Sequence, residues 1–196
     1  SLTRTETRTG TKEDPGARAE TGSKADPGAK ADAGTGAETG TGAAPGTRET
    51  DLLDPVNTVQ KVHAVVLSGG SAFGLESTCG VSQYLEERNI GFESGPCKVP
   101  IVVGAVLFDL AVGNYKIRPD KKMGYEACLN ASETDLKQGN YGAGCGASVG
   151  KLRGAEYVTK SGIGSCSIKL DNGIIVSALV AVNALGDVYE NGEVIA

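Results

Sequence analysis

Hydrophobic residues are distributed very unevenly along this chain. Residues 1–50 contain one large apolar residue, Leu2, among Thr, Gly, Ala, Pro and charged residues. Such a composition cannot bury enough apolar surface to offset the entropy lost on ordering, so it predicts a disordered tail. From Asp51 onward, apolar runs recur at the spacing of strands and helices, which indicates a globular α/β domain.

The first apolar runs of this second region predict a strand, a tight turn and a helix. Residues 62–67 form a short valine-rich run, which is typical of a buried strand. The glycine-rich residues 68–74 follow as a turn, and residues 75–88 then show the periodicity of a helix, which Asn89 and Gly91 end. The predicted apolar side of the helix consists of Leu75, Cys79, Val81, Tyr84 and Leu85.

Further elements follow towards the C-terminus. Residues 99–110 predict a second buried strand with its flank, and residues 123–131 a short helix. Residues 168–182 predict a hairpin around the turn 171–173, with its long apolar second strand buried. Residues 189–194 repeat the hairpin signal around an Asn-Gly turn, with only the start of a return strand. Because a fold does not normally end on half a hairpin, we expect the remainder to lie on another chain or to have been cut away.

Composition and charge exclude several classes of protein. The net charge of -5 and the pI of about 5.0 argue against a general nucleic-acid binder and against binding to an anionic membrane surface. No apolar run approaches the roughly 18 residues of a membrane span, and the polar start at Ser1 gives no signal peptide. Five cysteines without CxxC spacing indicate free thiols, so we expect a cytoplasmic protein.

The single histidine and the scattered cysteines do not predict a catalytic or metal site. His63 falls inside an apolar strand, where a structural role is the usual one. A Ser–His–Asp triad would need this histidine at a strand end or on a loop. Zinc needs three or four clustered Cys, His or carboxylate ligands, and no such cluster is present in the sequence. We therefore expect no metal.

The strand, glycine-rich turn and helix over residues 62–88 form a common setting for a phosphate at a helix N-terminus. Gly69 and Gly70 are adjacent, however, so the GxGxxG fingerprint is not met. A tight turn between strand and helix is the simpler interpretation. A nucleotide-binding α/β domain without catalytic activity stays an alternative.

A second glycine-rich stretch, residues 139–152, resembles a P-loop but departs from it at two positions. Cys145 stands where glycine is required, and Leu152 replaces the Mg²⁺-binding hydroxyl. What is left is a flexible loop that ends at Lys151 and could present N–H groups to an oxyanion. A plain surface loop with a solvated lysine is the more common structure. Asn183, at the end of the predicted strand, could likewise donate to an oxyanion or simply cap a turn.

Five sequence blocks, in the same order, resemble the L-aminopeptidase/D-Ala-esterase/amidase (DmpA-like) family. This family includes β-peptidyl aminopeptidases and nylon-oligomer hydrolases. The blocks are APGTRETDLLDP (44–55), HAVVLSGGSAFGL (63–75), VLFDL (106–110), GAGCGASVGK (142–151) and VAVNALGD (180–187).

This resemblance implies an αββα four-layer sandwich and a precursor that cuts itself into a larger and a smaller chain. Residues 44–196 then belong to the larger chain, and the nucleophile is the N-terminal Ser or Thr of the smaller chain. The α-amino group of that residue, with a pKa of about 8, replaces a histidine as the base. The implied substrates are short peptides or amides with a free N-terminal amine. The resemblance implies no cofactor, and it implies an oligomer of the two-chain unit.

The resemblance also assigns roles to individual residues. Asn183 matches the oxyanion-hole asparagine, and Lys151 matches a lysine that lines the active site in the nylon-hydrolase branch. Phe108 falls where that branch has a tyrosine, so the hydroxyl is missing here, which weighs against nylon-oligomer specificity more than against amide hydrolysis. We place Phe108 with Gly69 and Gly70 in the substrate-binding wall. Acyl transfer, as in the related ornithine acetyltransferases, is the alternative reaction.

Residues 1–43 depart from the family, whose members have apolar strands upstream of residue 44. Either low-complexity sequence has replaced these strands, or the residue types in this segment were not taken from a gene. We favour the second, because an ordered strand segment without Val or Ile is physically implausible. A measured mass that matches the printed sequence would exclude it.

Overall fold

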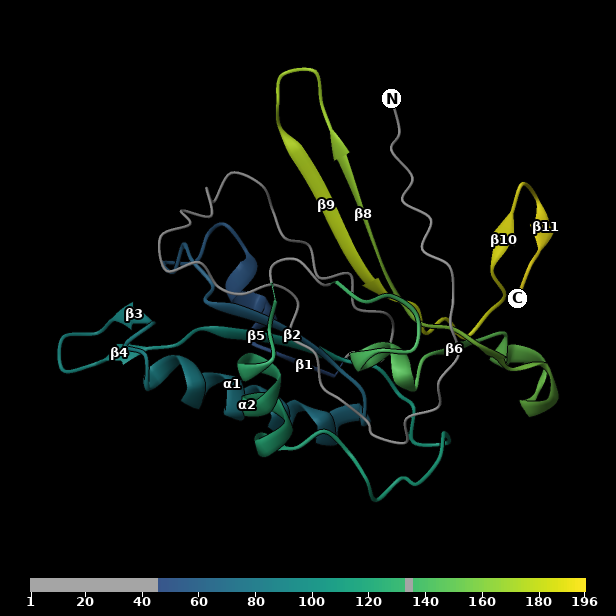
Figure 1. The fold of residues 1–196 in the computed structure, drawn as a ribbon, viewed down its shortest axis with the longest axis horizontal. Helices are drawn as coiled ribbons and strands as arrows, with labels where there is room; N and C mark the ends of the chain where they lie inside the picture. The colour runs from purple at the N-terminus through teal and green to yellow at the C-terminus, as the bar shows by residue number, and fades with distance from the viewer. Residues whose placement is uncertain (1–45, 133–135) are drawn as a thin grey trace.

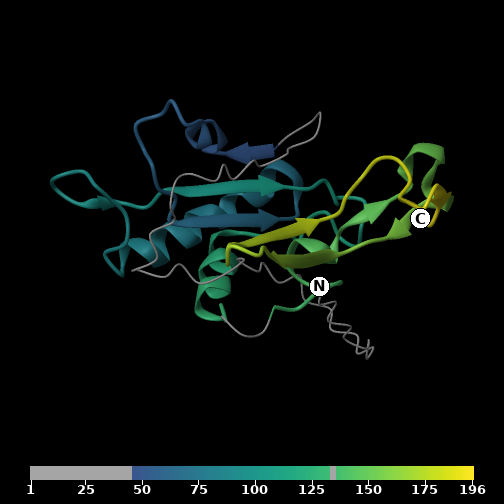
Figure 2. The same cartoon turned by 90° about the horizontal axis from the view of Figure 1, so that it is seen from above.

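A three-stranded sheet carries the buried centre of the molecule. The computed structural model describes residues 46–132 and 136–196, so the atypical segment 1–43 lies outside the described residues. The sheet has the order β1-β5-β2, in which β5 pairs parallel with β2 and antiparallel with β1 (Figures 1 and 2). Its strands are β1 (Gly46–Arg48), β2 (Ala64–Ser68) and β5 (Val102–Val106).

Valine fills the contact between the two parallel strands. Val66 of β2 and Val102 and Val103 of β5 are each at most 2% exposed. Branched side chains of this kind pack well on a pleated surface that is covered on both faces. The strand predicted over residues 62–67 is therefore confirmed as β2, and the one predicted over 99–110 is confirmed in its centre as β5.

Two helices, α1 (Ser77–Glu86) and α2 (Lys121–Leu129), pack against each other beside this sheet (Figure 1). They approach closely at two glycines. A Cβ atom at Gly80 would overlap the backbone of α2, and one at Gly124 would overlap the backbone of α1. Both helices were predicted from the apolar pattern, but the buried side of α1 differs from the prediction. Cys79 is exposed, because α1 turns its small residues, not its cysteine, towards α2.

The ends of the helices follow local signals. A 3-10 helix, Ser71–Glu76, leads from the glycine turn into α1. Asn89, with φ 56°, lies in the left-handed region just after α1, as the predicted stop requires. The side chain of Asp120 accepts a hydrogen bond from Met123 N at 2.8 Å and caps α2, which therefore begins two residues before the predicted start.

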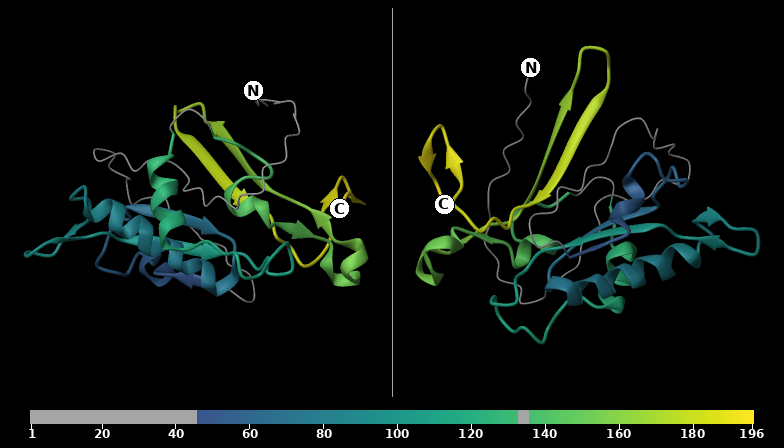
Figure 3. Two further views of the ribbon diagram at one scale, coloured as in Figure 1. Left: turned by 60° about the horizontal axis from the view of Figure 1, so that its bottom comes forward. Right: turned by 180° about the vertical axis from the view of Figure 1, so that it is seen from behind.

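A long hairpin stands away from the rest of the molecule (Figures 1 and 3). Its strands β8 (Ile163–Lys169) and β9 (Ile175–Ala181) pair antiparallel over seven residues, with Gly173 at φ 87° in the turn. The hairpin and its turn were predicted correctly. The predicted burial of the second strand is wrong: in the part of the chain that the structure describes, β9 pairs with β8 alone, and its apolar side chains are mostly exposed.

The remaining elements are short. The predicted Asn-Gly hairpin is confirmed, with Asn191 at φ 52°, Gly192 at φ 86° and a return strand of two residues. Its strands are β10 (Tyr189–Glu190) and β11 (Glu193–Val194). The other short strands are β3 (Phe92–Glu93), β4 (Lys98–Val99), β6 (Ser148–Val149) and β7 (Thr159–Lys160). The other 3-10 helices are Thr50–Leu53, Gly142–Cys145, Lys151–Arg153 and Ala155–Tyr157.

Two further observations bear on the chemistry of the chain. The five cysteines form no disulfide with one another, as predicted. Across residues 46–132 and 136–196, the helices are too short and too polar to cross a bilayer.

Candidate active site

The side chain of Asn183, just beyond the end of β9, is held at both ends of its carboxamide. Its Oδ1 atom accepts hydrogen bonds from Lys151 Nζ at 2.8 Å and from Ser148 N at 3.1 Å. Its Nδ2 atom donates to the main-chain oxygen of Phe108 at 3.1 Å. Three residues predicted from the sequence, Asn183, Lys151 and Phe108, are thus brought together from distant parts of the chain.

The ammonium group of Lys151 makes three contacts in the same place. Besides Asn183 Oδ1, it donates to Asn183 O at 3.2 Å and to Ala184 O at 3.3 Å. Burial away from water lowers the pKa of Lys151. The predicted solvated surface lysine is therefore wrong, because the side chain is drawn onto the segment that follows β9.

The backbone before Lys151 explains how the lysine reaches Asn183. Gly150 has φ 70°, a left-handed conformation that favours glycine. Gly150 N donates to Gly186 O at 2.9 Å, and Lys151 N donates to Leu185 O at 2.8 Å. These bonds fasten the glycine-rich stretch alongside the segment that carries Asn183.

The glycine-rich stretch itself is not the flexible surface loop that the sequence indicated. Residues 142–150 are buried apart from Cys145, which is partly exposed. Lys160 Nζ donates to Gly144 O at 2.6 Å and to Ser161 O at 2.5 Å, and so holds the turn in place. Burial lowers the pKa of Lys160, while the neighbouring Cys145 acts in the opposite direction. Sequence reasoning missed Lys160, whose isolated position gives no signal.

Phe108 contributes its main-chain oxygen to the site, while the residue as a whole is 61% exposed. The contact with Asn183 is made by the peptide carbonyl of Phe108, and the phenylalanine ring carries no hydroxyl that could make it. An exposed residue whose main chain contacts Asn183 is compatible with the predicted substrate-binding wall, and a ligand contact stays a prediction.

Gly69 and Gly70, the other predicted wall residues, contact a carboxylate from the same region. Gly70 N donates to Asp109 Oδ1 at 2.7 Å, and a Cβ atom at Gly69 would overlap Asp109 Oδ2. A phosphate at Gly70 N would have to displace this carboxylate, and the two anions would repel each other. The geometry therefore argues against a nucleotide at this turn. The sequence did not identify Asp109 as a site residue, because its hydrogen-bond partner is the main-chain N–H of Gly70, which no residue type reveals.

Comparisons with known proteins identify the family of this chain. Residues 21–194 match the model of peptidase family S58. The chain belongs to this family. The resemblance to the L-aminopeptidase/D-Ala-esterase/amidase family is thereby confirmed. The match begins inside segment 1–43.

Relatives of this S58 chain include both peptidases and amide hydrolases. Uncharacterized aminopeptidases of Mycobacterium leprae and Mycobacterium tuberculosis are 45% identical over 151 and 144 residues, which cover 74% of this chain and 40% of each relative. A 6-aminohexanoate-oligomer endohydrolase of Paenarthrobacter ureafaciens is 38% identical over 90 residues, 46% of this chain and 25% of the relative. The S58 chain thus spans well under half the length of these relatives.

His63, the only histidine in the sequence, was predicted inside an apolar strand, and this placement is wrong by one residue because β2 begins at Ala64. Its structural role stays a prediction. His63 lies just before β2, and its Nδ1 atom accepts a hydrogen bond from Ile101 N at 3.0 Å. Desolvation lowers its pKa most, and the nearby Lys61 lowers it further, against the raising effect of the hydrogen bond with Ile101. Over the two described segments, no three His, Cys or carboxylate side chains are grouped as metal ligands.

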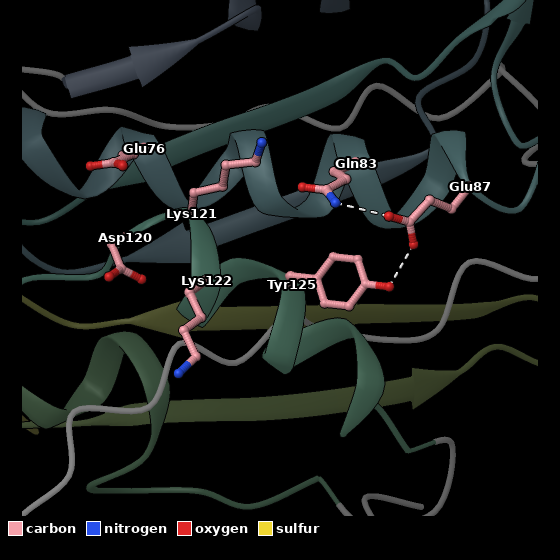
Figure 4. A pocket seen from close by; sticks show the side chains of 7 residues that line it. All are labelled: Glu76, Gln83, Glu87, Asp120, Lys121, Lys122 and Tyr125. Carbon is pink, nitrogen blue, oxygen red and sulfur yellow. Dashed lines mark hydrogen bonds between the residues drawn. The ribbon is translucent and has the colours of Figure 1, made fainter.

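A hollow of about 520 Å³ lies elsewhere, on the outer side of α1 and α2 (Figure 4). Tyr125 donates to Glu87 Oε2 at 2.5 Å and Gln83 donates to Glu87 Oε1 at 2.8 Å, so these polar groups satisfy one another. The hydrogen bond from Tyr125 is the main cause of the lowered pKa of Glu87. No predicted site residue lines this hollow, and the candidate site stays at Asn183. Its lining residues are Glu76, Gln83, Glu87, Asp120, Lys121, Lys122 and Tyr125.

Proposed function

We propose that this chain is the larger chain of a self-cleaved aminopeptidase or amidase, in which Asn183 stabilises the oxyanion. The observation that carries the proposal is the fixed carboxamide of Asn183, held by Lys151, Ser148 and Phe108. Membership of peptidase family S58 and the named relatives support amide-bond hydrolysis rather than acyl transfer.

The contacts of Asn183 suit a donor to a developing negative charge. Because Lys151 and Ser148 occupy Oδ1, the amide is oriented with Nδ2 away from them. One proton of Nδ2 goes to Phe108 O, and the other has no acceptor among the residues that the structure describes. That proton can bind the oxyanion of a tetrahedral intermediate. The cationic Lys151 polarises the carboxamide and strengthens this bond.

The nucleophile belongs, in this proposal, to the smaller chain. The resemblance assigns it to an N-terminal Ser or Thr, whose own α-amino group acts as base. This chain contributes no histidine to such a mechanism, since His63 is engaged with Ile101. The mechanism needs no metal and no cofactor: hydroxyl attack gives the tetrahedral intermediate, the amine leaves, and water releases the acyl group.

We further propose that the smaller chain completes an αββα four-layer sandwich. The exposed apolar side chains of the β8–β9 hairpin support this, because such a surface is costly to leave in water. The greater length of the relatives also leaves room for the missing elements. We expect the two-chain unit to form a homo-oligomer.

Short peptides or amides with a free N-terminal amine are the proposed substrates. The aminopeptidases among the relatives support a free amine, and the 6-aminohexanoate-oligomer endohydrolase supports amides other than α-peptides. The phenylalanine at position 108 makes nylon oligomers the less favoured choice.

Substitution of Asn183 tests the proposal directly. In the full-length protein, Asn183→Ala is expected to lower kcat by about 10²- to 10³-fold, equivalent to about 3–4 kcal/mol. Asn130→Ala is the matched control, since the Asn130 amide donates to Glu126 O at the end of α2, away from the candidate site. An unchanged kcat in the Asn183 variant, with the control normal, would refute the oxyanion assignment.

Self-cleavage has its own test. Denaturing mass spectrometry of the full natural protein is expected to find a second, smaller polypeptide that begins with Ser or Thr. A single uncut chain would remove the nucleophile and with it the proposed mechanism.

A further inference from the structure

The carboxylate of Asp109 lies in a slot between the two glycine-rich stretches. Its Oδ1 atom accepts the hydrogen bond from Gly70 N at 2.7 Å. A Cβ atom at Gly69 would overlap the carboxylate from one stretch, and a Cβ atom at Gly146 would overlap both the carboxylate and the methylene group from the other. Asp109 therefore touches both stretches at once.

Gly69 and Gly146 are required here for space and not for backbone conformation. Gly146 has φ -99° and ψ -2°, which other residues also adopt, and Gly69 does not have a positive φ. Gly70 differs, because its φ of 83° favours glycine in its own right. Glycine at positions 69 and 146 therefore leaves the space that the side chain of Asp109 occupies.

The residues that form this slot are close in sequence to the two main-chain groups that hold the Asn183 carboxamide. Phe108 O, which accepts from Asn183 Nδ2, is in the residue directly before Asp109. Ser148 N, which donates to Asn183 Oδ1, is two residues after Gly146. A shift of Asp109 would therefore move one anchor of the carboxamide relative to the other.

Main-chain bonds couple the segment before Asp109 to the turn after β2. Leu107 N donates to Ser68 O at 2.9 Å, and Ser71 N donates to Leu107 O at 3.0 Å. The carboxylate bond to Gly70 N is the side-chain part of this attachment. It is the part that a single substitution can remove without breaking the main-chain pairing.

We propose that Asp109 is a positioning residue for the hydrolysis proposed above, acting through Phe108 O on the orientation of Asn183. This inference rests on the proposed function. Loss of the carboxylate would leave a gap between the stretches, so that Phe108 O would no longer fix the direction of Asn183 Nδ2. A misplacement of about 1 Å is enough to cost about 100-fold in rate.

The test uses the full-length protein with Asp109→Ala and Asp109→Asn. We expect kcat to fall by about 10- to 100-fold in the alanine variant, with KM little changed, because the defect lies in transition-state orientation. The asparagine variant keeps shape and an acceptor for Gly70 N, so it is expected to restore most of kcat. Asp171→Ala, in the exposed hairpin turn, is the matched control.

A double-mutant cycle with Asn183→Ala separates positioning from general destabilisation. If Asp109 acts through Asn183, the Asp109→Ala change will lower kcat much less in the Asn183→Ala background than in the wild type. Equal effects in both backgrounds, or a wild-type kcat for Asp109→Ala alone, would overturn the proposal. An Asn183→Ala variant with normal kcat would instead refute the oxyanion assignment made under the proposed function, and this inference with it.

Gly146→Ala provides a second route if Asp109→Ala does not fold. Its methyl group enters the slot and displaces the carboxylate instead of removing it. The same fall in kcat, with KM little changed, is expected. Folded Gly146→Ala protein with a normal kcat would overturn the proposal.

Discussion

The ammonium nitrogen of Lys151 lies 2.8 Å from the carboxamide oxygen of Asn183, and it also contacts the main-chain oxygens of Asn183 and Ala184. The ammonium group thus has three acceptors on one short segment, residues 183–184. The lysine orients the amide, and its charge makes the bond to Oδ1 stronger than one between neutral groups. The protonation state of Lys151 should therefore affect how well Asn183 stabilises the oxyanion.

Lys151 predicts opposite effects of alkaline pH on activity and on stability. Since its pKa is lowered by burial, we expect kcat to fall with rising pH below the ordinary lysine value of about 10.4, as the charge on Nζ is lost. Stability should change the other way. Between the lowered folded pKa and the ordinary unfolded pKa, the unfolded chain binds more protons, so the free energy of unfolding rises with pH.

Lys151→Met checks this pair of effects. The variant is expected to have a lower kcat and to lack both the alkaline fall in kcat and the alkaline rise in stability. The measurements are kcat against pH and urea midpoints against pH. An alkaline limb that persists unchanged in Lys151→Met would assign it to another group.

His63 predicts a loss of stability in mild acid. Its lowered pKa means that the neutral ring is favoured in the folded chain, where Nδ1 accepts from Ile101 N. The contribution is present above the ordinary value of about 6.5 and is lost as pH falls through the lowered folded pKa. Asn at this position offers a non-titrating acceptor. The difference in unfolding free energy between wild type and His63→Asn, measured between about pH 5 and 8, should therefore shrink or reverse towards acid.

Phe108 predicts a gain of function. Phe108→Tyr adds a hydroxyl to a residue that is 61% exposed, so stability is expected to change by no more than about 0.5 kcal/mol. By resemblance to the nylon-hydrolase branch, hydrolysis of 6-aminohexanoate oligomers should rise relative to that of an aminoacyl amide. Phe73→Tyr, on another exposed ring, is the control for a general effect of an added hydroxyl. Equal substrate ratios in both variants would contradict the prediction.

A substitution at the crossing of α1 and α2 is expected to lower stability without lowering catalytic activity. Gly80→Ala forces a methyl group against Lys121 O and the backbone of Tyr125. We expect a loss of about 1–3 kcal/mol, the usual cost of overpacking, seen as a lower denaturant midpoint. Gly164→Ala is the control, since among the described residues its Cβ atom would meet Gln138 Oε1 alone, at an ordinary contact distance of 3.8 Å. Equal midpoints for the two variants would show that the helices can move apart.

Local signals in the sequence were enough to predict most of the elements. The Asn172-Gly173 turn identified the β8–β9 hairpin, and Asn89 marked the end of α1. Burial was harder to predict, because it depends on what lies beside an element. The apolar residues of β9 indicated an interior strand, whereas Gly80 gave no hydrophobic signal and yet lies at the helix contact.

The candidate site shows the same division. Asn183, Lys151 and Phe108 came from matching family blocks, and the structure brings them within hydrogen-bonding distance. Without the family resemblance, the sequence pattern favoured a turn cap for Asn183 and a surface loop for Lys151. Asp109 and Lys160 were not found, because their partners lie far away in sequence and are main-chain groups, which no residue type reveals.

The close fit of Asp109 against Gly69 and Gly146 has a consequence for how this sequence can diverge. A side chain at position 146 and a carboxylate at position 109 exclude each other as the backbone stands. In related chains, the loss of Asp109 should precede or accompany any residue larger than glycine at 146. Positions 109 and 146, which are 37 residues apart, are therefore expected to covary among related sequences.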